Sequence, residues 1–160
     1  MKEIEKAWNM LKSDDVEEYN KGISIIIEAL KNNAYIYELR KKLPKIFLDS
    51  YTAIDFHDFM LVGILFNKED QQIGPSIRLQ WYDYYETYGE NLVYEILYEG
   101  ISYYKIFGRE TLHPVYMLVN IFDMSEEGFM IHRILGSDGM MIEIGFGNIK
   151  IRKLLRQSDF

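Results

Sequence analysis

Residues 115–155 read VYMLVNIFDMSEEGFMIHRILGSDGMMIEIGFGNIKIRKLL, and this stretch decides the fold class. It contains four short runs of apolar and β-branched residues: Val115–Phe122, Phe129–Leu135, Met140–Phe146 and Ile149–Leu155. The turn-forming clusters DMSEEG, GSDG and GFGN separate these runs. Short apolar runs with glycine-containing turns between them are typical of antiparallel strands joined as a meander. We therefore predict a C-terminal antiparallel sheet.

The same stretch leaves one alternative open, which is a further helix over Ser125–Leu135. Ser125 would cap the start of that helix and Gly136 would end it, with two glutamates in its first turn. We prefer the meander. A helix over Ser125–Leu135 would instead favour an all-α fold, which is our alternative.

The N-terminal part of the chain has helical periodicity instead. Three helices are predicted there, because apolar residues recur at steps of three and four positions. Asp15 is placed to cap the second helix, and Pro44 limits the third, because proline disfavours helical geometry in the preceding residue. The apolar stripes of the three helices are Ile4, Trp8 and Leu11; Val16, Tyr19, Ile23, Ile26, Ile27 and Leu30; and Tyr35, Ile36, Leu39 and Leu43.

The middle of the chain is less decided. Thr52–Phe66 fits a helix, but its second half, Phe59–Phe66, equally fits a buried strand, because a short apolar run has no diagnostic period. Asn67–Pro75 is polar and predicts a loop, and Leu92–Ile106 predicts a helix from the spacing of its aliphatic residues. Together these expectations give an α+β fold, in which a helical N-terminal part packs on a C-terminal antiparallel sheet within one domain of residues 1–160.

Composition limits the function classes. The 160 residues include no cysteine, which excludes a disulfide framework, a thiolate metal site and a cysteine nucleophile. The net charge is −7 and the pI about 5.0, so the chain as a whole should repel nucleic acid and anionic membranes. The longest run without a charged side chain is the twelve residues Thr111–Phe122, whereas a bilayer needs about 20. We expect a cytoplasmic protein with no membrane or nucleic-acid partner.

No pattern of catalytic or cofactor-binding residues stands out. Glu110 and His113 have the Glu-x-x-His spacing of carboxylate metal sites, but the second pair that such sites need is missing. The single Gly-x-Gly at 145–147 lacks the rest of a dinucleotide fingerprint. We interpret His57 as a surface or hinge histidine and His132 as structural, and we expect no catalytic residues, no metal and no cofactor.

Negative charge is concentrated in the middle of the chain. Residues 51–145 hold fifteen acidic and five basic side chains, whereas residues 146–160 hold one acidic and four basic. No Lys or Arg occurs between Arg78 and Lys105, and tyrosines are interleaved with carboxylates there. The four basic residues near the C-terminus are interpreted as pairing partners for the acidic middle: Lys150, Arg152, Lys153 and Arg156.

This acidic, tyrosine-rich segment is the candidate functional surface. Tyrosine supplies a large contact area at low entropy cost, and clustered carboxylates steer a basic partner. On the predicted helix, Glu95 and Glu99 share one face, and a cationic partner would relieve their repulsion. We therefore expect a non-enzymatic protein-binding module, of the bacterial immunity or antitoxin type, that captures a basic protein such as a nuclease toxin. The predicted interface residues are Tyr84, Tyr85, Glu86, Glu90, Tyr94, Glu95, Tyr98 and Glu99.

Three other interpretations stay open. In the first, the tyrosines are half-buried core residues and the glutamates are a solvated face. In the second, the chain is a small-molecule-binding or enzymatic domain, whose apolar pocket holds carboxylates of raised pKa and is lined by Asp55, Asp58 or His113. In the third, the tyrosine surface is the subunit contact of a homo-oligomer.

Overall fold

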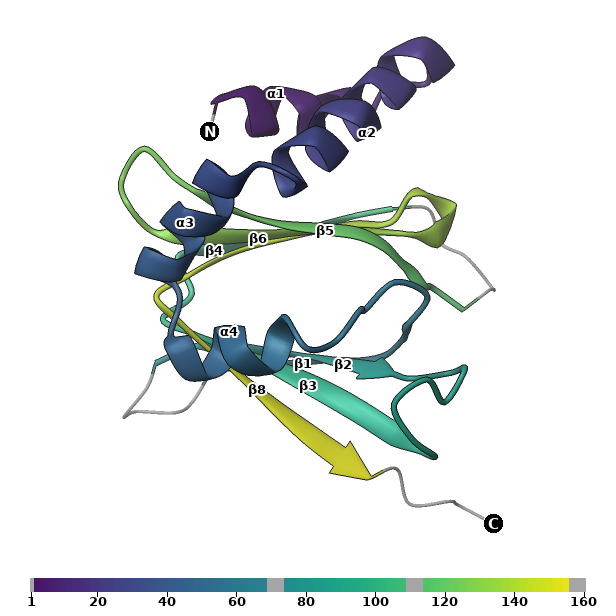
Figure 1. The fold of residues 1–160 in the computed structure, drawn as a ribbon, viewed down its shortest axis with the longest axis vertical. Helices are drawn as coiled ribbons and strands as arrows, with labels where there is room; N and C mark the ends of the chain where they lie inside the picture. The colour runs from purple at the N-terminus through teal and green to yellow at the C-terminus, as the bar shows by residue number, and fades with distance from the viewer. Residues whose placement is uncertain (1, 69–73, 109–113, 156–160) are drawn as a thin grey trace.

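The computed structural model of the protein describes residues 2–68, 74–108 and 114–155 (Figure 1). Within these residues four helices come first and eight strands follow, which confirms the predicted α+β class. No helix among them is long and apolar enough to cross a membrane. The helices are α1 (Lys2–Met10), α2 (Val16–Leu30), α3 (Asn33–Lys42) and α4 (Lys45–Tyr51). The strands are β1 (Met60–Asn67), β2 (Ser76–Tyr82), β3 (Leu92–Glu99), β4 (Tyr103–Phe107), β5 (Met117–Met124), β6 (Met130–Gly136), β7 (Met141–Phe146) and β8 (Asn148–Leu155).

The three predicted N-terminal helices are confirmed as α1, α2 and α3. Asp15 caps α2, because its Oδ1 accepts hydrogen bonds from the backbone N–H groups of Glu17 at 2.8 Å and Glu18 at 3.4 Å. Helices α1 and α2 cross closely, since a Cβ atom at Gly22 would lie 2.7 Å from the carbonyl oxygen of Ala7. Helix α4 has no counterpart among the predicted helices.

The strands form two four-stranded antiparallel sheets. Sheet A has the order β1-β2-β3-β8, and sheet B has the order β4-β7-β6-β5. The predicted C-terminal meander is confirmed for β5, β6 and β7, which are successive neighbours in sheet B, whereas β8 crosses to sheet A. The alternative helix over Ser125–Leu135 is wrong, because Met130–Gly136 forms β6 inside sheet B.

The helix predicted over Leu92–Ile106 is also wrong, because this segment forms β3 and β4. Alternate residues of β3 face the core between the sheets, as the period of two in a strand requires: Leu92, Tyr94, Ile96 and Tyr98. For Thr52–Phe66 the sequence left a helix and a strand open. The structure shows a connecting segment followed by strand β1, so the strand alternative is confirmed for the second half.

The chain passes between the two sheets at a shared corner. Gly100 (φ 62°) links β3 to β4, and Gly147 links β7 to β8. The backbone N–H of Gly147 donates to the carbonyl oxygen of Glu99 at 3.0 Å, so the two crossings are bonded to each other. At the other edge of sheet A, Met60 of β1 forms an isolated bridge with Tyr116, just before β5. The two sheets therefore form a sandwich whose layers are joined by backbone hydrogen bonds at two corners, one at Gly147 and one at Met60.

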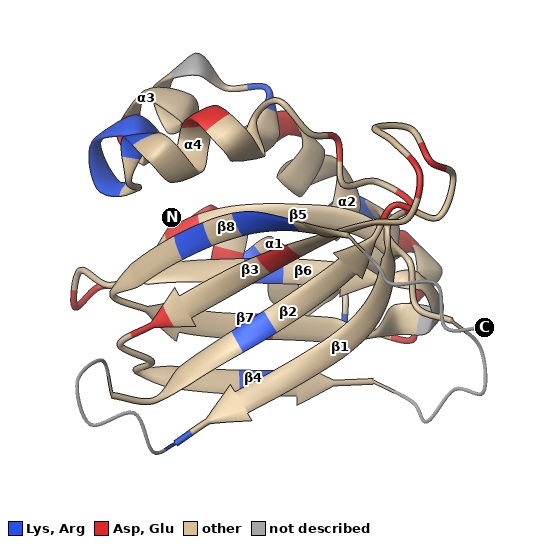
Figure 2. Cartoon of the chain, turned by 90° about the horizontal axis from the view of Figure 1, so that it is seen from below, with Lys and Arg blue, Asp and Glu red and all other residues tan. Residues whose placement is uncertain are grey.

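Two apolar clusters hold the layers together. The larger lies between the sheets and includes Trp81 and Phe146, together with Phe47 from α4. The smaller joins α1 and α2 to the outer face of sheet B, where Trp8 and Ile26 are buried. The outer face of sheet A is the open one, as Figure 2 shows with the strands of sheet A in front.

Candidate functional site

The eight predicted interface residues fall into two groups of different exposure. Four lie in the loop between β2 and β3 and are exposed: Tyr84, Tyr85, Glu86 and Glu90. The other four lie in β3, and at most 6% of any of them is exposed: Tyr94, Glu95, Tyr98 and Glu99. The structure therefore brings only the first four together at the surface. The second four split again, with the rings in the core and the carboxylates on the outer side of sheet A.

The carboxylates of Glu95 and Glu99 are paired within sheet A. Glu95 accepts a hydrogen bond from Arg152 Nε at 2.7 Å, and Glu99 accepts one from Lys150 Nζ at 2.9 Å. The predicted repulsion between the two acids is thus already relieved inside the chain, because β8 brings its basic residues beside them. The interpretation of the basic C-terminal residues as partners for the acidic middle is confirmed for Lys150 and Arg152, and Arg156 lies outside the described residues.

The two buried tyrosines belong to the core. The hydroxyl of Tyr98 lies 2.7 Å from Nδ1 of His132. Burial raises the pKa of the Tyr98 hydroxyl well above its usual value and lowers the pKa of His132 to about 3, so both side chains are neutral near pH 7. The ring of Tyr94 packs against Phe56 and Phe59, with both centroid distances 5.8 Å. For Tyr94 and Tyr98, the core interpretation is confirmed.

The exposed group sits on a loop with a fixed backbone. We call residues 83–91 the acidic tyrosine loop. Asp83 at its base is buried, and its carboxylate accepts from the backbone N–H of Thr87 at 3.0 Å and of Tyr88 at 2.7 Å. The hydroxyl of Tyr88 in turn accepts from the backbone N–H of Asp55 at 2.7 Å. These bonds order the loop and tie it to the segment between α4 and β1.

Tyr84 is the centre of a group of four tyrosine rings. Its ring centroid lies 5.2 Å from that of Tyr85, 6.0 Å from that of Tyr116 and 6.3 Å from that of Tyr82. All three pairs meet edge to face, an arrangement that stabilises aromatic pairs by roughly 0.5–1.5 kcal/mol beyond the burial of their surface. The rings of Tyr84 and Tyr85 are therefore held in position although 50% and 67% of their surface is exposed.

Acidic residues occur in the same loop as Tyr84 and Tyr85 and in the segment that is hydrogen-bonded to that loop. The segment between α4 and β1 contributes two acids, and the acidic tyrosine loop contributes Glu86 and Glu90 besides the buried Asp83, at the end of sheet A where Figure 2 shows red loops. Residues 46–67 and 79–104 contain no Lys or Arg, and the Nδ1 atom of His57 lies 3.0 Å from the Asp58 carboxylate. We call the following seven residues the acidic tyrosine end: Asp55, Asp58, Tyr84, Tyr85, Glu86, Glu90 and Tyr116.

Backbone strain is concentrated at the same end. Within the part of the chain that the structure describes, the non-glycine residues with positive φ are Asp58 (66°), Glu86 (54°) and Asn91 (54°). This left-handed region costs an L-residue roughly 1–2 kcal/mol, and Asp and Asn tolerate it better than Glu does. Strain of this kind persists where the surroundings enforce it, and it clusters at functional sites. Its presence therefore supports the acidic tyrosine end as the candidate site.

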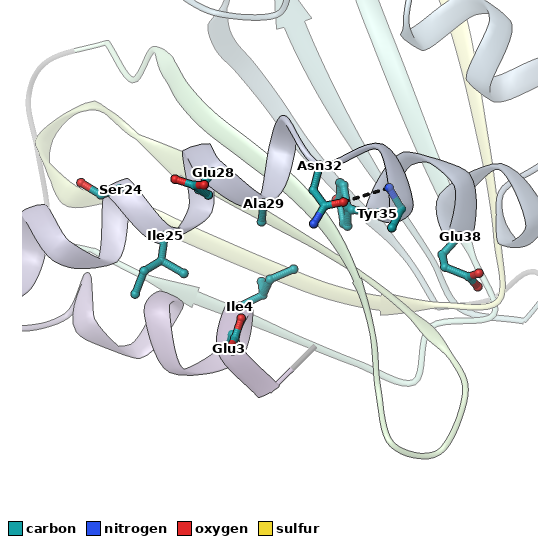
Figure 3. Close-up of a pocket in the computed structure, with 10 residues that line it drawn as sticks. Glu3, Ile4, Ser24, Ile25, Glu28, Ala29, Asn32, Tyr35 and Glu38 are labelled. Atoms are coloured by element: carbon teal, nitrogen blue, oxygen red, sulfur yellow. Dashed lines mark hydrogen bonds between the residues drawn. The ribbon is translucent and has the colours of Figure 1, made fainter.

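Concave surfaces lie around the helices. A cavity of about 610 Å³ between α1, α2 and α3 has Glu3, Glu28 and Glu38 at separate places along its lining (Figure 3). The side chain of Asn32 lies at its wall and caps α3, because its Oδ1 accepts from the backbone N–H of Ala34 at 2.9 Å. Glu38 forms an ion pair with Lys41 at 3.0 Å, and Lys41 itself does not line the cavity.

A second cavity, of about 760 Å³, lies between α1 and sheet B. Glu143 on its floor is half-buried. Burial alone would raise the pKa of Glu143, but hydrogen bonds from Arg133 Nε at 3.0 Å and from the Tyr103 hydroxyl at 2.8 Å hold that pKa below its usual value. This shift is opposite to the raised carboxyl pKa that the hypothesis of a carboxylate-containing pocket requires.

The residues named for a carboxylate-containing pocket do not meet in either cavity. Asp55 and Asp58 line neither, and His113 lies outside the described residues, as does Glu110 of the Glu-x-x-His pair. Among the residues that are described, no three His, Asp or Glu side chains are grouped so that they could hold a metal ion. Asp55 and Asp58 lie instead in the segment between α4 and β1, where the backbone N–H of Asp55 donates to the Tyr88 hydroxyl of the acidic tyrosine loop.

Comparisons with known proteins place the chain in no family. No family model matches it, and no curated protein matches it. The chain is similar to a solved structure described as an uncharacterized protein from Neisseria gonorrhoeae, with 18% sequence identity and a TM-score of 0.45. The match covers 62% of this chain and 95% of the other. A likeness of this strength shows neither a family nor a function.

Proposed function

We propose that the chain is a non-enzymatic protein-binding module that captures a basic protein through the acidic tyrosine end. The observation that carries this proposal is the exposed pair Tyr84 and Tyr85, held beside Glu86 and Glu90 on a loop whose backbone is fixed by buried Asp83. A bacterial inhibitor of the immunity or antitoxin type, acting on a toxin with a basic cleft, is the finer form of the proposal.

Three physical effects favour binding of a basic protein at this surface. Exposed tyrosine rings bury much area on binding while losing few rotamers. Exposed carboxylates in segments that contain no Lys or Arg create a negative field that speeds the approach of a basic partner. A loop that is ordered before binding avoids the entropy cost of ordering it in the complex. Four of the originally predicted residues drop out of this surface because they are buried, and Asp55, Asp58 and Tyr116 enter it.

The test begins with affinity capture from the native source, using the intact chain and the double variant Tyr84→Ala/Tyr85→Ala as parallel baits. We expect a basic protein that is retained by the intact chain and lost from the variant. Charge reversal by Glu86→Lys/Glu90→Lys should then slow association with that protein and flatten its dependence on salt. The matched control is Glu126→Lys/Glu127→Lys, which reverses two exposed acids in the β5–β6 turn.

Two outcomes would contradict the proposal. One is a captured protein that binds the tyrosine variant and the intact chain equally. The other is a partner whose association slows as much with the Glu126 and Glu127 reversals as with the loop reversals, because that would reflect net charge rather than this surface.

A further inference from the structure

A third cavity, of about 720 Å³, lies between α3, α4 and β5, and it shares no residue with the acidic tyrosine end. We call it the α3–α4 cavity. Its volume falls within the roughly 300–1,000 Å³ of small-molecule sites. Aliphatic and aromatic side chains form most of its walls, including Ile36, Leu39, Leu48, Ile121 and Phe122.

The polar groups of its floor are already bonded to each other. The Tyr51 hydroxyl donates to Asn120 Oδ1, and His132 Nε2 lies 3.2 Å from the same oxygen. The Tyr35 hydroxyl donates to the carbonyl oxygen of Phe122 and accepts from its N–H at 2.9 Å. The floor therefore presents an apolar surface with no ionised group, and the buried end of a ligand should be a hydrocarbon.

The charged side chains lie at the edges of the cavity. Arg40 from α3 and Lys45 from α4 line it, with Asp49 as the one acid. Neither Arg40 nor Lys45 forms an ion pair with another described residue, whereas Lys41 on the same turn of α3 is paired with Glu38 at 3.0 Å. Two unpaired cations against one carboxylate leave an excess of positive charge beside an apolar chamber.

We propose that the α3–α4 cavity binds a small organic anion with a hydrocarbon body, such as a medium-chain carboxylate. The hydrocarbon lies against Leu39, Leu48 and Phe122, where its transfer from water is favourable. The carboxylate lies between Arg40 and Lys45, and the guanidinium of Arg40 has the planar donor pair that binds a carboxylate at two points. This site is independent of the acidic tyrosine end. Its ligand is an anion, whereas the partner proposed for the acidic tyrosine end is a basic protein.

Calorimetric titration of the intact chain with decanoate, below its micellar concentration, tests the proposal. We expect saturable binding of one decanoate, and at least tenfold weaker binding of decyltrimethylammonium, which has the same hydrocarbon chain and the opposite charge. Arg40→Glu should weaken decanoate binding at least tenfold. Lys42→Glu makes a similar change of charge two residues away, outside the cavity lining, and should alter binding less than twofold.

A second variant tests the chamber itself. Ile36→Trp replaces a partly exposed wall residue and should fill part of the volume, so that decanoate binding is lost while the unfolding transition stays cooperative. The loop variant Glu86→Lys/Glu90→Lys should bind decanoate as the intact chain does. The proposal is overturned if decanoate does not bind saturably, if the cation binds as well as the anion, or if Arg40→Glu and Lys42→Glu weaken binding equally.

Discussion

The Tyr98 hydroxyl lies 2.7 Å from Nδ1 of His132, and this contact joins sheet A to sheet B across the apolar core. His132 Nε2 lies 3.2 Å from Asn120 Oδ1, so both ring nitrogens have a partner. The ring of Phe122 stacks on the imidazole with a centroid distance of 4.0 Å and 14° between the planes. A neutral imidazole suits this environment, because it can accept from Tyr98 and donate to Asn120 at the same time.

The first prediction concerns pH. Burial lowers the pKa of His132 from 6.5 to about 3, so between these values the unfolded chain binds a proton that the folded chain does not. The free energy of unfolding should therefore fall as the pH drops from 6.5 towards 3, by up to about 1.4 kcal/mol per pH unit from this group. Urea denaturation at pH 7.5, 6 and 5 measures the slope. His132→Gln should lose the contribution of His132 to this slope. Identical slopes in the two proteins would contradict the lowered pKa of His132.

The second prediction concerns the hydroxyl that joins the sheets. Tyr98→Phe leaves Nδ1 of His132 buried without its donor, which should lower the free energy of unfolding by about 1–3 kcal/mol. Tyr104→Phe is the matched control, because Tyr104 is a half-exposed tyrosine of β4, and it should change stability by less than about 0.5 kcal/mol. Equal stability of the two variants in denaturant titrations would show that the Tyr98–His132 contact contributes nothing net.

The third prediction concerns the ionic group under α1. Buried Arg133 donates to both Asp123 and Glu143. Arg133→Met removes the guanidinium that donates to both carboxylates and should cost about 3–5 kcal/mol, because the two carboxylates lose this partner. Adding Asp123→Asn and Glu143→Gln should recover most of that loss, which chemical denaturation can measure. A triple variant less stable than the single one would show that packing by the Arg133 side chain, and not charge, sets the cost.

The fourth prediction concerns the crossing of α1 and α2. Replacing glycine by alanine inside a helix normally stabilises it by up to about 1 kcal/mol. At Gly22 the new Cβ would lie 2.7 Å from the carbonyl oxygen of Ala7, so we expect Gly22→Ala to destabilise the protein by about 1–3 kcal/mol instead. Ser24→Ala, on an exposed face of the same helix, is the control and should not lower the melting temperature.

The fifth prediction concerns the order of the acidic tyrosine loop. Asp83→Ala removes the acceptors of the Thr87 and Tyr88 amides, so exchange of these two hydrogens with solvent should speed up at least tenfold. Exchange in the core strand β6 should stay slow in the same experiment. Unchanged protection at Thr87 and Tyr88 would mean that other contacts hold the loop, and the case for a pre-ordered surface would weaken.

The helices and the meander were predictable because their patterns depend on near neighbours in the chain. The stripe of α2 and its Asp15 cap lie within one segment, and the strands of sheet B are separated by clear turns. Strand β3 was not predictable in this way, because both of its faces are buried and no polar alternation marks it. Its apolar residues at 92, 93, 96 and 97 fit a helix and a strand equally well.

Only the part of the candidate site that lies within one segment was predictable, because contacts between distant residues leave no local pattern. The interleaving of tyrosine and acid from Trp81 to Tyr104 indicated a surface, and residues 84–90 form one. The burial of Glu95 depends on Arg152, which is 57 positions away, and no local pattern reveals such a pair. Tyr116 likewise reaches Tyr84 only through the tertiary fold. The lack of Lys and Arg over 46–67 was the one signal that Asp55 and Asp58 belong to the same negative surface.

The pairing of β8 with β3 has a consequence for biosynthesis. Sheet A stays incomplete until residues 148–155 have left the ribosome, because β8 is its edge strand beside β3. Until that moment Glu95 and Glu99 have no ammonium or guanidinium from β8, and the hydrogen-bonding edge of β3 is open to other nascent chains. A stage that is prone to aggregation therefore precedes the emergence of β8, and pairing of this eight-residue strand with β3 ends it.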